Sequence, residues 1–229
     1  MKTIGLIGGM SWESTIPYYK AINEYVGKEL GGFHSAKILL YSVDFAELEE
    51  NMSKGKWDRN ASLLSEAAIR LEKAGADVIL ICTNTMHKLF YDVQERVSVP
   101  LIHIALATAD ALEKDGIKRV ALLGTKYTMT EDFYKERLKE RGFEVLIPEE
   151  EDMQIVHDVI FDELCHGIIK EESRKEYARI IAALKEKGAE AVILGCTEIG
   201  LLITPEDSVL PAYDTTLIHA ESAARYALL

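Results

Sequence analysis

Short apolar runs alternate with longer amphipathic segments along the whole chain. Runs such as VILIC at 78–82 are apolar on consecutive residues, which is typical of parallel strands covered on both faces. We therefore expect strands at 3–8, 37–43, 77–82, 118–123 and 190–195. Apolar residues at three- and four-residue spacing predict helices at about 14–29, 58–74, 104–115, 130–141, 149–165, 171–187 and 214–227. This alternation predicts an α/β fold with parallel sheets and right-handed crossovers.

A stretch near the middle of the chain is repeated near its end. LEKAGADVILICTNT at 71–85 aligns without gaps with LKEKGAEAVILGCTEI at 184–199 when Gly75 is set on Gly188, 113 residues later. Chance easily matches one apolar strand with another. It matches a helix end, a turn and a strand with polar residues after it far less easily, so the alignment indicates a duplication.

The beginning of the chain supports the same duplication. KTIGLIGG at 2–9 resembles KRVALLGT at 118–125. We therefore expect two related, pseudo-symmetric α/β halves, 1–115 and 116–229, of the Rossmann-like parallel type.

Polar residues follow the repeated strand in both copies. They are Thr83-Asn84-Thr85 in the first and Cys196-Thr197-Glu198 in the second, and the repeat sets Thr83 on Cys196. In open parallel sheets, ligands bind beyond the carboxyl ends of the strands. If the halves face each other across a pseudo-twofold axis, the active site lies between them and Thr83 and Cys196 reach it from opposite sides. A two-base racemase needs such a pair, because one group removes the α-proton and the other returns a proton on the far side.

Strand geometry excludes a pair made of Cys82 and Cys196. Adjacent residues of a strand point to opposite faces, so Cys82 and Thr83 do not both face the cleft, and the repeat selects Thr83. We expect Cys82 to be a small buried hydrophobic residue, and Cys165 likewise.

The two members of the pair differ as proton-transfer groups. Cys196 ends a strand, and a helix is expected to begin after it. A thiol at a helix N-terminus is held nearer its thiolate form, which accepts a proton. An unassisted hydroxyl is a poor base at neutral pH, so the residues alone leave a purely structural role for Thr83 equally open.

The loops after the first strand of each half are candidates for holding a carboxylate. Gly8-Gly9-Met10-Ser11-Trp12 lacks the G-x-G-x-x-G spacing of dinucleotide sites, and its glycines instead let a small ligand approach the backbone. Gly124-Thr125-Lys126 occupies the matching place in the second half. The six histidines show no metal-ligand spacing, and there is no nucleophile elbow, P-loop or zinc cysteine set. We expect no metal.

Composition restricts the partners. Lys plus Arg number 26 and Asp plus Glu 38, a net charge of −12 without any basic run, so nucleic acid and anionic membranes are not expected partners. No apolar run is long enough to span a bilayer, and the N-terminal stretch lacks a signal-peptide cleavage pattern. Three cysteines form no disulfide framework, so we expect a cytoplasmic protein.

Three motifs together resemble the aspartate/glutamate racemase family. They are GLIGGMSWESTIPYYKAIN at 5–23, CTNTMH at 82–87 and GCTEIGLL at 195–202, and the similarity runs the full length. The resemblance implies a two-domain α/β fold, homodimers, no pyridoxal phosphate or other cofactor, and paired cysteines that exchange the α-proton of an amino-acid substrate. It also implies that the C-terminal helix packs back onto the first domain, giving domains 1–115 with 208–229, and 116–207.

The resemblance assigns roles to residues one by one. Cys196 matches the second family cysteine, and Thr83 stands where the first is usual, as in the bacterial L-aspartate/glutamate-specific racemases, in which the threonine partners the remaining cysteine. The other residues are implied to bind substrate: Asn84, Thr85, Thr125 and Thr197 at the α-carboxylate and α-amine, Met10 in the pocket lining, and Lys170 at an acidic substrate.

One departure concerns the substrate side chain. Aspartate-specific relatives carry an arginine after the second strand, but SVDFAELEEN at 42–51 has none. A distal carboxylate therefore loses its fork-shaped partner, so the substrate is aspartate or glutamate held by Lys170, or an amino acid with a neutral polar side chain. Two rival functions stay open: a one-cysteine decarboxylase or isomerase of small dicarboxylic acids, and a non-catalytic amino-acid-binding protein.

Overall fold

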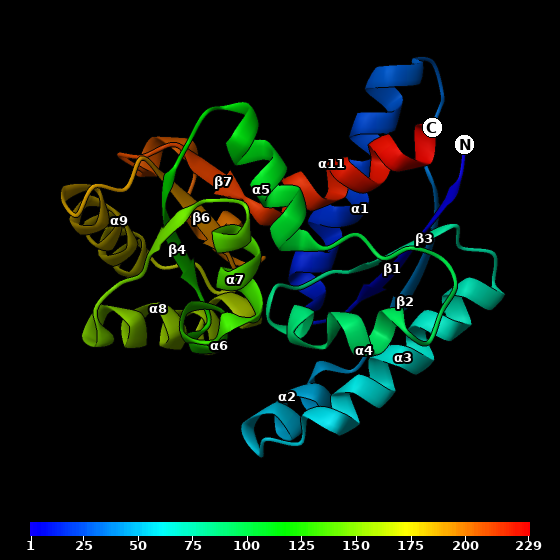
Figure 1. The fold of residues 1–229 in the computed structure, drawn as a ribbon, viewed down its shortest axis with the longest axis horizontal. Helices are drawn as coiled ribbons and strands as arrows, with labels where there is room; N and C mark the ends of the chain where they lie inside the picture. Colours follow the sequence, from blue (N-terminus) through cyan, green and yellow to red (C-terminus); the bar gives the residue numbers. More distant parts are fainter. The chain divides into compact units, whose positions relative to one another are not determined.

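The computed structural model describes residues 1–229, which form two compact units (Figure 1). Unit 1 comprises Met1–His103 and His219–Leu229, and unit 2 comprises Ile104–Ile218. Both sheets are parallel, as the sequence predicts, and each predicted strand and helix is present with its ends shifted by a few residues. No helix is both long enough and apolar enough to cross a membrane.

Unit 1 is built on a three-stranded sheet in the order β2-β1-β3. One face is covered by α1 and α11, whose apolar residues form a single cluster with Ile4, Leu6 and Val78 (Figure 1). Asn60 Nδ2 donates to Leu48 O at 2.9 Å and ties α3 to α2. The elements are β1 (Thr3–Gly8), α1 (Trp12–Leu30), β2 (Lys37–Ser42), α2 (Phe45–Ser53), α3 (Trp57–Lys73), β3 (Val78–Ile81), a 3₁₀ helix (Thr85–Leu89), α4 (Phe90–Gln94) and α11 (Thr215–Leu228), whose first turn belongs to unit 2.

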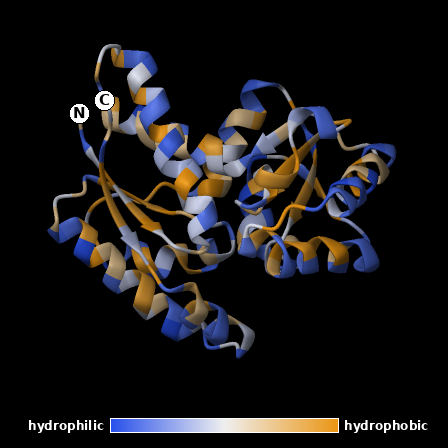
Figure 2. Ribbon diagram, turned by 180° about the vertical axis from the view of Figure 1, so that it is seen from behind, coloured by the Kyte–Doolittle hydropathy of each residue, from blue (hydrophilic) through white to orange (hydrophobic).

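Unit 2 is built on a four-stranded sheet in the order β5-β4-β6-β7. Successive residues of β4 point to opposite faces: Ala121 and Leu123 pack with α8 and α9, whereas Val120 and Leu122 pack with α5 and α7. Apolar strands thus run through the middle, and the helices turn hydrophilic faces outward (Figure 2). The elements are α5 (Ile104–Lys114), β4 (Arg119–Gly124), α6 (Lys126–Thr130), α7 (Asp132–Glu140), β5 (Glu144–Leu146), α8 (Glu150–Asp162), α9 (Glu171–Glu186), β6 (Ala191–Gly195), α10 (Ile199–Leu202) and β7 (Ala212–Asp214), with 3₁₀ helices at Leu164–His166 and Pro205–Asp207.

The chain passes between the units at other residues than the expected domain bounds, which were 1–115 with 208–229 and 116–207. The segment 104–115 lies in unit 2 because α5 packs in the same cluster as β4 and α7. The segment 208–218 also lies there, because β7 pairs with β6. A sequence repeat aligns related strands, but it contains no information about the unit on which a connecting helix packs.

The duplicated segments have the same backbone geometry. Gly75 and Gly188 end α3 and α9 with φ angles of +98° and +96°, a left-handed conformation that glycine adopts without steric penalty. Ile4 of β1 lies opposite Val78 of β3, and the equivalent Val120 of β4 lies opposite Ala191 of β6. The repeat therefore describes one local β–α–β structure that occurs twice.

The acidic residue of each repeat fixes the first rung of its sheet. Asp77 N donates to Thr3 O at 2.8 Å, and Asp77 Oδ2 accepts from Thr3 N at 2.6 Å. In unit 2, Glu190 N donates to Arg119 O at 2.8 Å and Glu190 Oε2 accepts from Arg119 N at 2.9 Å. Each carboxylate binds a backbone N–H that begins a central strand, so it holds the register of the neighbouring strands.

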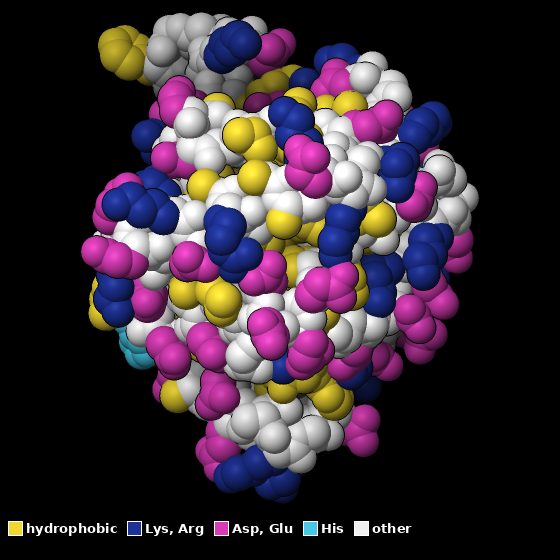
Figure 3. Space-filling view, turned by 90° about the vertical axis from the view of Figure 1, so that its left-hand side faces the viewer, with side chains coloured by type: hydrophobic (Ala, Val, Ile, Leu, Met, Phe, Trp, Pro, Cys, Tyr) yellow, Lys and Arg dark blue, Asp and Glu magenta, His cyan; other side chains and the backbone are white.

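The exposed side of unit 2 carries both signs of charge. Figure 3 shows Lys and Arg side chains interspersed with Asp and Glu over this face. On α9, Arg179 pairs with Asp152 of α8 at 2.5 Å, and Arg174 pairs with Asp207 at 2.7 Å. Surface pairs such as Arg179 with Asp152 contribute little stability individually, whereas the side chains of Arg174 and Asp207 are both largely buried.

Unit 1 buries neutral histidines in its core. His219 Nε2 donates to Ile102 O at 2.8 Å, and because this nitrogen carries the hydrogen, Nδ1 accepts from Tyr18 Oη at 2.9 Å. The His87 ring lies 5.6 Å from the His219 ring. Burial lowers the pKa of His87 to about 4 and that of His219 to about 3, because a desolvated imidazolium is unfavourable.

These histidines predict acid destabilisation of unit 1. Below pH 6.5 the unfolded chain protonates both imidazoles, but the folded chain does so only near pH 4 and pH 3. The free energy of unfolding should therefore fall as pH drops from 6.5 to 5, with a slope that approaches about 1.4 kcal/mol per pH unit for each histidine. Denaturant melts followed by the fluorescence of Trp12 and Trp57, which both lie in unit 1, measure this slope.

His219→Gln keeps a donor at the ε position but removes one titrating group. The slope of its unfolding free energy against pH should therefore be smaller by the contribution of one histidine. His34→Gln alters an exposed histidine of the same unit and serves as the control. An unfolding free energy that stays constant between pH 6.5 and pH 5 would contradict the prediction.

Candidate active site

Thr83 lies immediately beyond β3, where the strand ends in a tight backbone turn. Cys82 N donates to Ile7 O at 2.9 Å and extends the pairing with β1, whereas Thr83 N turns back to Ile81 O at 2.9 Å. Cys82 is fully buried in the cluster that contains Val78, as strand alternation predicts, and burial raises the pKa of its thiol. Thr83 is 7% exposed.

Cys196 lies at the equivalent position beyond β6 and is hydrogen bonded to a neighbouring carboxylate. Its Sγ donates to Glu198 Oε2 at 2.9 Å, and Thr197 Oγ1 donates to the same oxygen at 2.9 Å. All three residues are buried. This carboxylate contact goes beyond what the sequence predicts, although an acid two residues after a cysteine at a strand end is a signal that points to it.

The expectation that a helix N-terminus favours the Cys196 thiolate is wrong. The following helix α10 begins only at Ile199 and spans four residues. Burial, with the charge of Glu198 as the second cause, raises the pKa of the Cys196 thiol well above its ordinary value. In this state the sulfur therefore carries its proton and presents it to Glu198.

The turn between β7 and α11 is hydrogen bonded to the end of β6 and to the Cys196 loop. Thr215 Oγ1 donates to Leu194 O at 2.8 Å, and Thr216 Oγ1 donates to Thr197 O at 3.4 Å. Asp214 Oδ1 accepts from Thr216 N at 2.8 Å and caps the helix. These residues escaped prediction from the sequence, because β7 has only three residues and no periodic pattern; the Asp-Thr-Thr run before a helix was the available signal.

The loop after β1 was expected to hold a carboxylate, but the backbone N–H of Gly9 in this loop is already hydrogen bonded. Gly9 N donates to Thr15 Oγ1 at 2.9 Å, and Thr15 Oγ1 donates to Ser11 O at 2.9 Å. Gly9 has a φ of +88°, and a Cβ there would collide with Val43 O. Met10 follows this turn and is buried. The turn thus brings the ends of β1 and β2 together without leaving the Gly9 N–H available.

The loop after β4 is the counterpart in unit 2. Thr125 is buried and caps α6, with its Oγ1 accepting from Thr128 N at 3.3 Å. Gly124 lies opposite Gly195, and a Cβ on Gly124 would lie 2.7 Å from Gly195 O, so two glycines allow the ends of β4 and β6 to approach closely. Thr125 and Cys196 are therefore carried by neighbouring strand ends.

The remaining predicted residues divide into buried and exposed positions. Asn84 and Thr85 are buried beside Thr83 at the start of a 3₁₀ helix. Lys170, by contrast, precedes α9 with its side chain 53% exposed, and its Nζ pairs with Glu163 Oε1 at 3.1 Å. Lys170 is thus the one predicted site residue that lies away from the strand ends.

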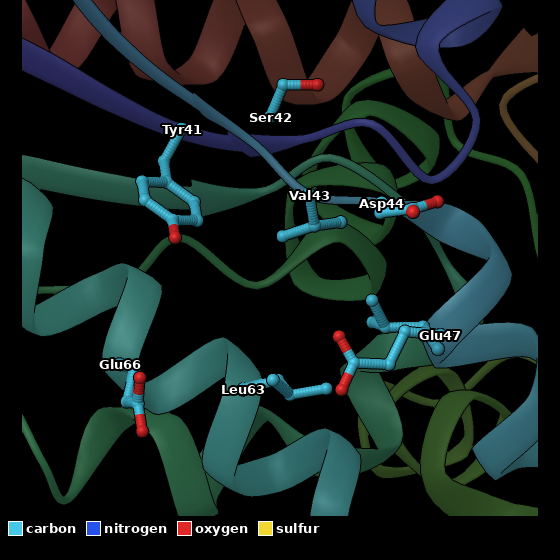
Figure 4. Close-up of a pocket in the computed structure, with 8 residues that line it drawn as sticks. Tyr41, Ser42, Val43, Asp44, Glu47, Leu63 and Glu66 are labelled. Atoms are coloured by element: carbon cyan, nitrogen blue, oxygen red, sulfur yellow. The ribbon is translucent and has the colours of Figure 1, made fainter.

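A pocket of about 140 Å³ opens at the carboxyl end of β2. Figure 4 shows Asp44 and Glu47 on one side of it, and Tyr41 and Glu66 on the other. The Arg70 guanidinium donates a hydrogen bond to Tyr41 Oη and forms an ion pair with Glu66 at 3.4 Å. The charged side chains among the lining residues, Asp44, Glu47 and Glu66, are all acidic, and the segment 42–51 contains no arginine.

The chemistry of the two strand ends is that of proton transfer. Unit 2 offers a thiol with an attached carboxylate, and unit 1 offers a hydroxyl on a rigid turn. No cluster of three or more His, Cys, Asp or Glu side chains is arranged to hold a metal ion.

Comparison with known proteins shows which family the chain is similar to. The sequence profile of the Asp/Glu/Hydantoin racemase family matches residues 7–223. A proposed Asp/Glu racemase from Yersinia pestis is 53% identical with a TM-score of 0.92, and an aspartate racemase homologue from Pyrococcus horikoshii OT3 is 38% identical with a TM-score of 0.86; the match covers 100% of both chains in each case. The broad-specificity amino-acid racemase of Bacillus subtilis (strain 168) is 26% identical over 96% of this chain and 95% of its own length.

A family profile that spans nearly the whole chain, together with full-length structural similarity, settles the relationship. The chain belongs to the Asp/Glu/Hydantoin racemase family.

Proposed function

We propose that this protein is a cofactor-independent amino-acid racemase in which Cys196 and Thr83 are the two proton-transfer groups. The observation that carries the proposal is the hydrogen bond from the Cys196 thiol to Glu198, in a chain of a racemase family. A buried thiol needs a partner that takes its proton before it can act as a base, and Glu198 Oε2 lies 2.9 Å from the sulfur.

Glu198 takes the proton of Cys196, and the thiolate then removes the α-proton of the L-enantiomer. The Thr83 hydroxyl gives its proton to the opposite face of the carbanion. One turnover leaves an extra proton on the Cys196–Glu198 pair and leaves Thr83 one proton short, so water resets both groups. A hydroxyl and a thiol are unequal acids and bases, so the turnover numbers for the two enantiomers differ although the equilibrium is racemic.

We propose that the α-carboxylate and α-amine of the substrate are bound by Asn84, Thr85, Thr125 and Thr197, with Met10 lining the pocket. Four of these are short polar side chains buried at strand ends, where a small zwitterion can replace water.

Aspartate and glutamate are the proposed substrates, with Lys170 as the partner of the distal carboxylate. The acidic residues of the pocket after β2 would repel that carboxylate. Lys170 would therefore exchange Glu163 for the substrate. A neutral polar side chain would need no such exchange.

Solvent exchange tests the activity directly. In D₂O, a panel of L-amino acids should gain α-deuterium, with aspartate and glutamate fastest, and D-aspartate should exchange at a different rate from L-aspartate. Cys196→Ala should abolish exchange because it removes the base, whereas Cys82→Ala, the matched control at a buried cysteine, should retain it. NMR of the α-position measures these rates.

The absence of exchange with any amino acid, or full activity in Cys196→Ala, would contradict the proposal. Equal exchange rates for the two enantiomers would contradict only the proposed asymmetry between Cys196 and Thr83. Release of CO₂ from a small dicarboxylic acid would favour the one-cysteine decarboxylase. Tight amino-acid binding without exchange would favour the binding protein.

The thiol–carboxylate pair predicts a distinctive pH dependence. Alkylation of Cys196 by iodoacetamide should still be accelerating above pH 9, because burial and Glu198 raise its pKa. Glu198→Gln should move this profile to lower pH, since the repelling charge is removed, and should lower racemisation by about 10²-fold. Mass spectrometry follows the reaction residue by residue, with partly buried Cys165 as the internal control. A profile unchanged by Glu198→Gln would show that the carboxylate does not act on this thiol.

A homodimer is also proposed, in which α1 meets a second copy. Trp12, Ile16 and Tyr19 follow one another at four- and three-residue spacing on α1 and are 62%, 56% and 57% exposed. Light scattering after size exclusion should give twice the chain mass for wild type and a lower mass for Ile16→Glu. Tyr91→Glu, at an equally exposed residue of α4, should leave the mass unchanged. A monomeric wild type, or a dimeric Ile16→Glu variant, would argue against this face.

A further inference from the structure

One buried side chain holds the backbone of Thr83 directly. His87 Nδ1 lies 2.7 Å from the carbonyl oxygen of Thr83, one helical turn earlier in the chain. A carbonyl oxygen only accepts, so this hydrogen bond requires the tautomer of the neutral ring that carries its hydrogen on Nδ1. The bond closes the turn that follows β3 and fixes the peptide plane next to the Thr83 side chain.

The His87 ring is itself held on several sides. Phe90 stacks on it with ring centres 5.8 Å apart and planes 14° apart. The rings of His103 and His219 lie 4.8 Å and 5.6 Å away, and His219 is bonded in turn to Tyr18. All of these residues are at least 90% buried, so His87 has little freedom to leave the Thr83 carbonyl.

Two of these neighbours occupy special places in the chain. His103 is the last residue of unit 1 before the chain passes into unit 2, and His219 is the first residue on its return. The residues packed around the His87 ring therefore include those at which the chain leaves and re-enters unit 1.

We propose that His87 is the positioning residue of Thr83, setting the orientation of its hydroxyl through the hydrogen bond to its carbonyl. The inference rests on the proposed role of Thr83 as a proton-transfer group. Proton transfer depends steeply on geometry, and a displacement of about 1 Å can reduce a rate by about 10²-fold. Burial, which lowers the pKa of His87 to about 4, keeps the ring neutral at physiological pH.

Three variants of His87 separate the hydrogen bond from the shape of the ring. His87→Asn keeps an N–H donor at the δ position, His87→Gln moves it one bond further to the ε position, and His87→Leu removes it. His219→Gln alters a neighbouring buried histidine that does not bond to Thr83 and serves as the matched control.

Substrates deuterated at Cα give the decisive measurement, with L- and D-aspartate as the probes. Racemisation has an equilibrium constant of one, so kcat/KM should fall equally in both directions in His87→Leu, by about tenfold to a hundredfold. The isotope effect on kcat/KM should rise for D-aspartate, from which Thr83 takes the proton. It should shrink for L-aspartate, because reprotonation by Thr83 then limits the rate. His87→Gln should give the same pattern as His87→Leu, whereas His87→Asn should restore wild-type values. His219→Gln, which keeps the donor to Ile102 O, should change the isotope effects far less than His87→Leu does.

Isotope effects unchanged in His87→Leu, or changed as much in His219→Gln, would overturn the inference while leaving the racemase intact. A wild type that exchanges no α-proton would instead contradict the proposed function. ¹⁵N NMR of the wild type is independent of activity and of the folding of any variant. It should show His87 neutral with the hydrogen on Nδ1 at pH 7, and the Nε2–H tautomer would overturn the inference by itself.

Discussion

The pairing of the two central strands in each unit is the constraint on which the site depends. β1 with β3, and β4 with β6, run parallel in a fixed register, so their carboxyl ends and the loops that follow come together. Asp77 and Glu190 hold the opposite ends of these pairs through hydrogen bonds to the first residues of β1 and β4. A shift of the register by one residue would turn the side chains of the shifted strand to the opposite face of the sheet. It would also displace the loops that carry Thr83 and Cys196.

Burial decides the chemistry of the Cys196 loop. A thiolate placed there alone would be strongly unfavourable, and a carboxylate beside it makes the negative form more unfavourable still. The same carboxylate accepts the thiol hydrogen, so the sulfur is neutral in this structure. The same oxygen of Glu198 also accepts the Thr197 hydroxyl.

Periodicity in the sequence predicted the long elements because their burial repeats over many residues. It missed β5 and β7, which have three residues each and owe their conformation to pairing with β4 and β6. Among the candidate site residues, strand alternation placed Cys82 in the core correctly. The state of the Cys196 thiol was predicted wrongly, because a helix dipole was inferred where burial and Glu198 dominate. The bond between His87 and Thr83 was beyond prediction, since it depends on a turn whose geometry tertiary packing imposes.

The discontinuity of unit 1 has a consequence for how the chain acquires its structure. Ala220, Ala223, Ala224 and Ala227 of α11 cover a face of the first sheet, and Lys2 N donates to Ala227 O at 2.9 Å. During synthesis from the N-terminus, the whole of unit 2 is therefore made before the residues that close unit 1 exist. Until then α1 alone covers this face of the N-terminal sheet, and the apolar area that α11 will cover stays exposed. The incomplete chain is therefore more prone to aggregation and to capture by chaperones than the finished protein.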